Sequence, residues 1–133
     1  MAGQIPVVDY LVLGDQPHLV ANRCTACGGQ FFDRRNACAN CEGTSFDRVP
    51  LATTGKVRSF TIVHRAAPNV PTPYVSALVD LDNGGGCVKA NVLNTEPTPD
   101  KVTLGMSVRL TTFVADTDSQ GTEAVAFGFE PAA

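Results

Sequence analysis

Four of the five cysteines form two Cys-x-x-Cys pairs, Cys24–Cys27 and Cys38–Cys41, with ten residues between the pairs. Four thiolates at this spacing are typical of one tetrahedral zinc site. Glycines follow both pairs, at 28, 29 and 43, where the chain turns while backbone N–H groups approach sulfur. Disulfides or a redox pair are the alternatives, although nothing in the sequence argues for an oxidising compartment. Because four cysteines leave no open coordination position, the expected zinc is structural rather than catalytic.

The segment around these cysteines depends on the metal for its stability. Between residues 20 and 48 only Phe31, Phe32, Phe46 and a few aliphatic side chains are available for a core. So small a core does not offset the entropy lost on folding. A structural zinc ion contributes an apparent binding free energy of about 10–16 kcal/mol, and that energy becomes folding energy. We therefore predict a rubredoxin-like zinc ribbon over residues 19–49.

The rest of the chain has the composition of a globular protein. Of its 133 residues, 44% are hydrophobic and 17% are charged, which predicts one domain with a buried core beside the small ribbon. The longest apolar run, Val7 to Leu13, is interrupted by Asp9 and is too short to span a membrane. The N-terminus lacks the pattern of a signal peptide. These features predict a cytoplasmic protein with no membrane association.

Beyond the ribbon, apolar residues alternate with polar ones, as they do in half-buried strands. A turn at Asn83–Gly86 joins two of these segments into a hairpin. Five antiparallel strands predict a small closed barrel of the OB kind over residues 50–133, with an SH3-like barrel as the rival. Residues 1–18 are predicted to form a helical segment, with a short helix at 7–13 closed by Gly14. The predicted strands are 56–64, 75–81, 88–92, 108–114 and 125–129. The fold class is thus mainly β.

No catalytic group can be assembled from the sequence. His64 follows the first barrel strand without an adjacent carboxylate or cysteine, and His18 has even less context. Cys87 lies outside the zinc set. A cysteine in this position more often packs as a small apolar side chain than acts as a nucleophile. Asp80 and Asp82 share one strand face that suits solvent, and the Gly84–Gly86 run lacks the Lys-Ser/Thr of a phosphate loop. Whether the chain is an enzyme at all stays open at this point.

The ordered set of features resembles the bacterial and archaeal zinc-ribbon/OB-fold acyl-CoA-associated family. The resemblance runs over nearly the whole chain, and the cysteines are its one diagnostic piece. The matching segments are Val7 to Leu13, Leu19 to Gly28, Cys38 to Cys41, Gly55 to His64, Pro73 to Leu81, Leu104 to Val108 and Phe127 to Pro131.

The resemblance implies an accessory subunit rather than a solitary enzyme. Similar proteins assemble with a thiolase, a thiolase-like acyltransferase, or a thiolase-like (lipid-transfer-protein-like) aldolase that shortens steroid side chains as CoA thioesters. In such complexes the thiolase-fold subunit supplies the catalytic groups. The expected assembly is a heterotetramer with two copies of each chain around the thiolase dimer axis, and acyl-CoA is the expected ligand of the complex.

Charge suggests where CoA would bind. Residues 1–65 contain seven Lys and Arg against five Asp and Glu, whereas residues 66–133 contain three against eight. We therefore expect Arg34, Arg35, Arg58 and Arg65 to be candidates for contact with CoA phosphates, because the guanidinium fork binds phosphate bidentately. Solvated strand edges and screening of the thiolates explain the same charges equally well.

Two further expectations concern partners. Zinc ribbons and OB barrels also bind single-stranded nucleic acid, but the sequence pI of about 5.2 opposes that alternative. The last strand places Val125, Phe127 and Phe129 on one face, which should fill the barrel. Its other face is small, with Ala124, Ala126 and Gly128, and should permit close approach by another backbone.

Overall fold

The computed structural model describes residues 3–132, and within that range it contains ten strands and no helix. Residues 1 and 2 of the predicted segment 1–18 lie outside the described residues, and so does residue 133 of the predicted segment 50–133. None of the described residues belongs to a helix long and apolar enough to cross a membrane.

The predicted helix at residues 7–13 is wrong. Strand β1 (Gln4–Pro6) precedes this segment, which forms a turn in which the Leu11 N–H donates to the Val8 carbonyl at 3.3 Å and then strand β2 (Leu11–Val12). Leu11 pairs with Leu19 of the next strand and is buried there. β-Branched residues favour extended backbone, and these tertiary contacts outweigh the weak helical pattern of so short a run.

The zinc ribbon is built around strand β3 (His18–Cys24), which pairs antiparallel with the strands on both of its edges. Strand β4 (Gln30–Phe31) lies on one edge and strand β5 (Phe46–Pro50) on the other. Strand β5 continues through residues 51–53 into the barrel, so the ribbon is tied to the barrel by a short connection.

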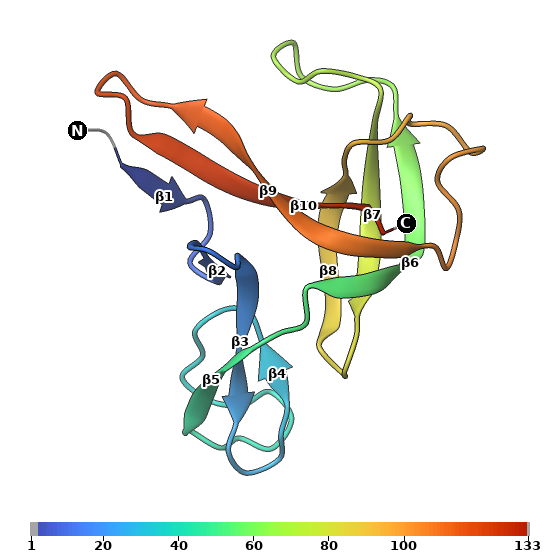
Figure 1. Cartoon of the computed structure of the whole chain (residues 1–133). Coiled ribbons are helices and arrows are strands. Elements are labelled where there is room, and N and C mark those ends of the chain that lie inside the picture. The colour runs from blue at the N-terminus through green and yellow to red at the C-terminus, as the bar shows by residue number, and fades with distance from the viewer. Residues whose placement is uncertain (1–2, 133) are drawn as a thin grey trace.

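All five predicted barrel strands are present, and their hydrogen bonds close a ring. Their order is β6–β7–β8–β10–β9, with β9 returning to pair with β6. Strands β8 and β10 run parallel, with Phe129 opposite Val92, and the other neighbours are antiparallel. This is the Greek-key ring of an OB fold (Figure 1). The strands are β6 (Thr54–Val63), β7 (Tyr74–Leu81), β8 (Gly86–Val92), β9 (Ser107–Thr117) and β10 (Glu123–Pro131).

The ring closes at Gly55, where β6 pairs with both of its neighbours. Gly55 lies opposite Leu81 of β7 and opposite Val108 of β9. A Cβ atom at this position would overlap the backbone carbonyl of Asp80 and the side chain of Val79. Glycine is therefore required here because three backbones approach one another closely.

Strands β9 and β10 continue past the barrel as a projecting hairpin (Figure 1). Strand β1 lies alongside this hairpin and pairs parallel with β10, from Gln4 opposite Glu123 to Pro6 opposite Val125. The register between β9 and β10 shifts between Ala124 and Val125, which leaves Ala115 as an extra residue on β9. We call the projection the arm; it comprises β1, residues 111–117 and residues 123–126.

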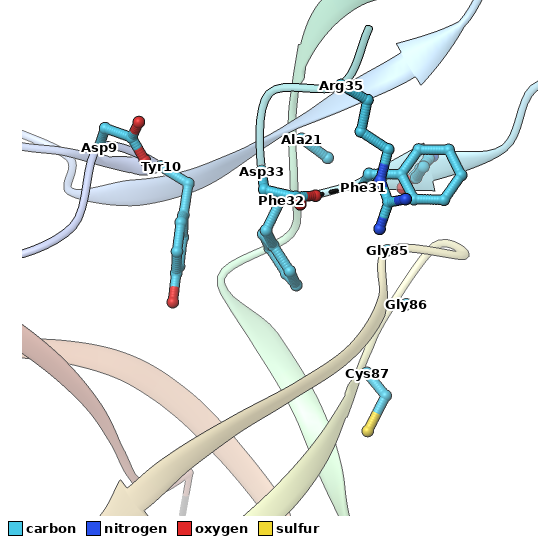
Figure 2. A pocket seen from close by; sticks show the side chains of 11 residues that line it. Asp9, Tyr10, Ala21, Phe31, Phe32, Asp33, Arg35, Gly85, Gly86 and Cys87 are labelled. Atoms are coloured by element: carbon cyan, nitrogen blue, oxygen red, sulfur yellow. Dashed lines mark hydrogen bonds and ion pairs between the residues drawn. The ribbon is translucent and has the colours of Figure 1, made fainter. Parts of the chain in front are cut away.

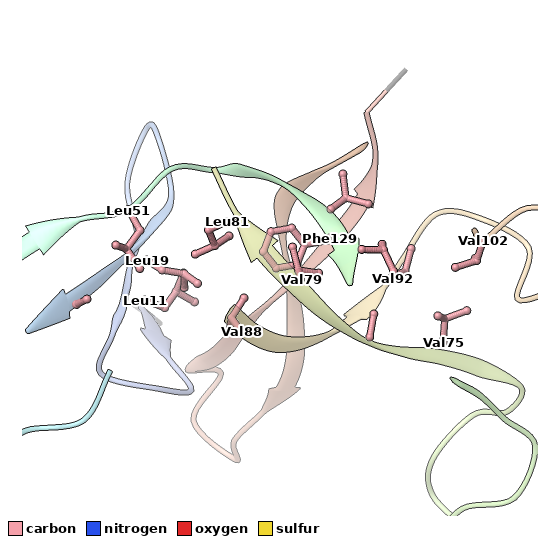
Figure 3. Close-up of a cluster of buried hydrophobic side chains, with 14 residues drawn as sticks. Leu11, Leu19, Leu51, Val75, Val79, Leu81, Val88, Val92, Val102 and Phe129 are labelled. Carbon is pink, nitrogen blue, oxygen red and sulfur yellow. The ribbon is translucent and has the colours of Figure 1, made fainter. Parts of the chain in front are cut away.

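The ribbon and the barrel share one hydrophobic core (Figure 3). Phe129, Val79 and Val108 are fully buried inside the barrel. Leu11 and Leu19, from the N-terminal segment and the ribbon, belong to the same buried cluster. Apolar burial of this kind makes the two parts one cooperative unit.

A row of aromatic rings also crosses from the ribbon to the barrel. Phe32 lies 4.8 Å from Tyr10, Tyr10 lies 6.0 Å from Phe127, and Phe127 lies 6.3 Å from Phe129, measured between ring centroids. The last two contacts are edge-to-face, an arrangement that aromatic pairs prefer. This row fixes the ribbon against strand β10.

The face of β10 that carries Ala124, Ala126 and Gly128 is covered by this chain itself at Gly128. A Cβ atom at Gly128 would lie 2.5 Å from Leu93 Cδ1 and 3.0 Å from the carbonyl of Asn91. The close approach expected at Gly128 is therefore made by the segment after β8 rather than by another protein. Ala124 and Ala126, farther along the arm, are half-buried.

Candidate metal centre and the ribbon–barrel junction

The four predicted zinc ligands come together at the tip of the ribbon. Their Sγ atoms all lie within 4.8 Å of one another. The Cys24–Cys41 pair is separated by 3.5 Å and the Cys27–Cys38 pair by 3.6 Å, and all four are free thiols rather than disulfides. A tetrahedral site with zinc–sulfur bonds of about 2.3 Å needs sulfur–sulfur distances of about 3.8 Å. The constellation therefore fits zinc.

The two Cys-x-x-Cys loops have the same backbone geometry. In each loop the first cysteine donates its N–H to the carbonyl five residues on, and its carbonyl accepts from the N–H four residues on. Gly28 and Glu42 occupy the equivalent fourth positions, with φ of 81° and 68°. The bonds are Cys24 to Gly29 (2.8 Å), Gly28 to Cys24 (3.0 Å), Cys38 to Gly43 (2.7 Å) and Glu42 to Cys38 (2.8 Å). This repeat makes the site a pair of zinc knuckles.

Hydrogen-bond donors around the sulfurs favour thiolates. The Asn40 side chain donates to Cys27 Sγ at 3.5 Å, and with the Gly29 backbone N–H it lowers the pKa of the Cys27 thiol to about 6. The Gly43 N–H acts in the same direction on Cys41, but hydrogen bonding with Cys24 and Cys27 raises the pKa of Cys41 to about 12. Ionisation of one thiol thus makes ionisation of its neighbours less favourable. A divalent cation bound among the four sulfurs removes this repulsion. Because Asn40 belongs to no motif, its role could not be predicted from the sequence.

A cavity of about 430 Å³ lies where the ribbon meets the barrel. Its walls come from the N-terminal segment, from the ribbon loop after β4, and from the turn between β7 and β8 (Figure 2). The Arg35 guanidinium lies 4.2 Å from the centre of the Phe31 ring and pairs with Asp33 at 3.2 Å. A cation over an aromatic face, beside a pocket of this size, is a usual feature of small-ligand sites. Sequence reasoning missed the cavity because its walls meet only through tertiary packing.

The four candidate arginines are not gathered in one place. Arg35 lines the cavity just described, and Arg34 lines a smaller neighbouring cavity of about 240 Å³ together with Arg48. Arg58 pairs with Asp80 across β6 and β7 at 2.8 Å, and this carboxylate raises the pKa of the guanidinium. Arg65 is exposed beyond the end of β6.

The remaining candidates stay apart from one another. Cys87 is half-buried at the start of β8, opposite Asp80, and lines the larger cavity. His64 is exposed beyond β6, at the opposite end of the same sheet, where Val63 pairs with Tyr74. His18 Nδ1 donates a hydrogen bond to the nearby Gln16 carbonyl, at 2.9 Å. Among residues 3–132, Cys87 and the two histidines therefore form no nucleophile–base pair.

Comparison with known proteins identifies a family and a solved structure with this architecture. The family described as the ChsH2 rubredoxin-like zinc ribbon domain matches residues 13–47, and the ChsH2 C-terminal OB-fold domain matches residues 48–113. A chain of the solved structure named Ltp2-ChsH2(DUF35) aldolase is 32% identical, with 87% of this chain and 86% of that chain covered and a TM-score of 0.68.

A protein of unknown function from the DUF35 family of Sulfolobus solfataricus is 19% identical, with 80% of this chain and 73% of that chain covered and a TM-score of 0.49. The search of curated proteins gives no significant match.

The fold and the four-cysteine site define a zinc-ribbon/OB-fold protein. The chain belongs to the ChsH2 family. The predicted family resemblance, zinc ribbon and OB barrel are thereby confirmed. A zinc-ribbon domain whose four cysteines lie this close together supports a structural zinc ion.

Proposed function

We propose that this chain is a non-catalytic zinc-ribbon/OB-fold subunit that binds and stabilises a thiolase-superfamily enzyme acting on acyl-CoA thioesters, in steroid or lipid side-chain degradation. One observation carries the proposal: the chain is similar over 87% of its length to a chain of an aldolase that is named for two proteins, Ltp2 and ChsH2. The lack of a nucleophile–base pair among Cys87, His64 and His18 supports it. In this proposal the partner supplies the catalytic groups, in a heterotetramer with two copies of each chain.

The proposed role of the metal is structural. Cys24, Cys27, Cys38 and Cys41 would hold one Zn²⁺, and the ion would fix the geometry of the ribbon without contacting substrate. Because the ribbon shares the hydrophobic core with the barrel, the metal would also support the barrel indirectly. The surface that meets the partner would then depend on zinc.

Co-expression tests the proposed partnership. The candidate partner is the thiolase-like enzyme subunit encoded nearest to this chain in its genome. We expect the two chains to co-purify, each more soluble than when expressed alone, with a mass by light scattering that equals two copies of each. Aldolase or thiolase activity should require the partner's catalytic residues. A chain that elutes as an unchanged monomer beside the partner would contradict the proposal.

We also propose that Arg34 and Arg35 contact the phosphates of CoA in the complex. Both line cavities at the ribbon–barrel junction, and Arg35 is held in place by Phe31 and Asp33. Arg58 and Arg65 remain weaker candidates, since Arg58 is already paired with Asp80. A guanidinium beside an open cavity is suited to bidentate phosphate binding.

Substitution of Arg35 tests the CoA contact. Arg35→Ala in the purified complex should weaken acyl-CoA binding by about tenfold and reduce its salt dependence, since one charge-assisted contact is lost. Lys101→Ala is the matched control, because this exposed cation lies in the loop between β8 and β9 and lines none of the cavities described above. Calorimetry with CoA measures both. Equal affinity for the two variants would rule out a role for Arg35.

A further inference from the structure

One face of the arm forms a shallow apolar trough. Ala124 and Ala126 alternate along β10 and form its floor. Ile5 of β1 lies opposite Ala124, and Phe113 of β9 lies opposite Ala126, so the two large side chains form the walls. Directly opposed residues of neighbouring strands point to the same face of a sheet. The trough is therefore two small side chains between two large ones.

The walls of this trough are exposed to solvent. Ile5 is 55% exposed and Phe113 is 39% exposed, which places both among the large apolar side chains that this chain leaves uncovered. Apolar side chains scattered singly over a surface need no explanation, but a contiguous set on a projecting element indicates an interaction site. The arm projects away from the barrel and the ribbon, so its outer end is accessible to a second protein (Figure 1).

The outer end of the trough is acidic. Asp116 lies opposite Ala124, and a hollow of about 250 Å³ on this face is lined by Ile5, Ala124, Asp116 and Asp118. Residues 111–126 contain three acidic side chains and no Lys or Arg. Asp116 accepts a hydrogen bond from the Thr117 N–H at 2.8 Å. It forms no ion pair with any of residues 3–132.

We infer that the trough is a docking site for an apolar segment of the partner enzyme that carries a Lys or Arg at one end. This inference rests on the proposed function, which supplies the partner. The apolar part of the segment covers Ile5, Phe113 and the alanines, and the basic side chain meets Asp116. A second copy of this chain is a poor occupant, because it would bring another uncompensated acidic arm against the first.

Affinity measurements on arm variants test the inference. Ile5→Asp and Phe113→Asp should each weaken binding of the partner subunit by at least about tenfold, the effect expected of residues central to an interface. Asp116→Lys should weaken it by a smaller factor and remove the salt dependence of association. Val70→Asp is the matched control, since Val70 is 42% exposed in the connector between β6 and β7, and it should bind like the unmodified chain.

The outcomes separate the two proposals. If the unmodified chain binds the partner and both arm variants bind equally well, the docking site is wrong and the proposed function survives. If the unmodified chain does not bind the partner, both proposals fail. If the chain dimerises by itself and Phe113→Asp makes it monomeric, the occupant is a second copy and the inference is overturned. Unchanged melting temperature and zinc content in each variant show that binding, rather than folding, has changed.

Discussion

Replacement of Cys38 by serine should abolish zinc binding and unfold the ribbon. Cys38 is buried, and its Sγ lies 3.6 Å from that of Cys27, so serine would leave the metal with three thiolates and a poor fourth donor. The binding free energy of a structural zinc ion is about 10–16 kcal/mol, which exceeds what the few apolar side chains of the ribbon contribute. This loss should exceed the cost of truncating a side chain in the hydrophobic core.

Metal content and the NMR spectrum measure the effect together. Atomic emission should find one zinc per unmodified chain and none in Cys38→Ser, and the NMR signals of the ribbon and of the core that it shares with the barrel should be lost together. Removal of zinc from the unmodified chain by a chelator should reproduce this result and prevent assembly with the partner. Cys87→Ser is the matched control, because Cys87 lies outside the cluster. A folded, zinc-free Cys38→Ser protein would refute a structural metal.

Truncation of Phe129 to alanine should destabilise the chain by about 3–5 kcal/mol, the usual cost of removing a buried aromatic ring. Phe129 is fully buried in the barrel. It also contacts Phe127, through which the aromatic row continues to the ribbon. Its removal leaves a cavity between strands β8 and β9, whose Val92 and Leu110 lie opposite it. A loss of this size is a large part of the total stability of a small domain.

Urea denaturation of the zinc-loaded chain measures this cost. Phe113→Ala is the control within the same hairpin, because its ring is 39% exposed and should cost about 1 kcal/mol or less. The shared core predicts a single transition in which ribbon and barrel unfold together. Equal losses for the two phenylalanines would contradict the burial that the structure assigns to them.

Most of the features that could be predicted from the sequence follow from local patterns of residues. The zinc ligands were found because metal coordination fixes both the residue type and the short spacing within each pair. The five barrel strands were found because each is long enough to show alternation, and the Gly84–Gly86 turn marked the hairpin. Neither inference needed any knowledge of distant contacts.

Apart from Asn40, which acts within the ribbon, the errors and omissions involve distant contacts. Strand β1 exists because Ile5 and its neighbours pair with β10, about 120 residues away, and no pattern at residues 7–13 reveals this. Gly128 looked like a site for a partner, whereas Leu93 fills that space. The cavity beside Arg35 depends on how the turn at Gly85 packs against the ribbon. Such features follow from the tertiary structure and have no local signature.

The pairing of the first strand with the last has a consequence for biosynthesis. During translation the zinc ribbon can form early, since its strands all lie within residues 18–50. Strand β1 must instead wait until Glu123–Val125 has left the ribosome. The trough combines Ile5 with Ala124, about 120 residues later in the sequence, so it forms only after both segments have been synthesised. An enzyme that docks there would thereby exclude from assembly any chain that ends before Ala126.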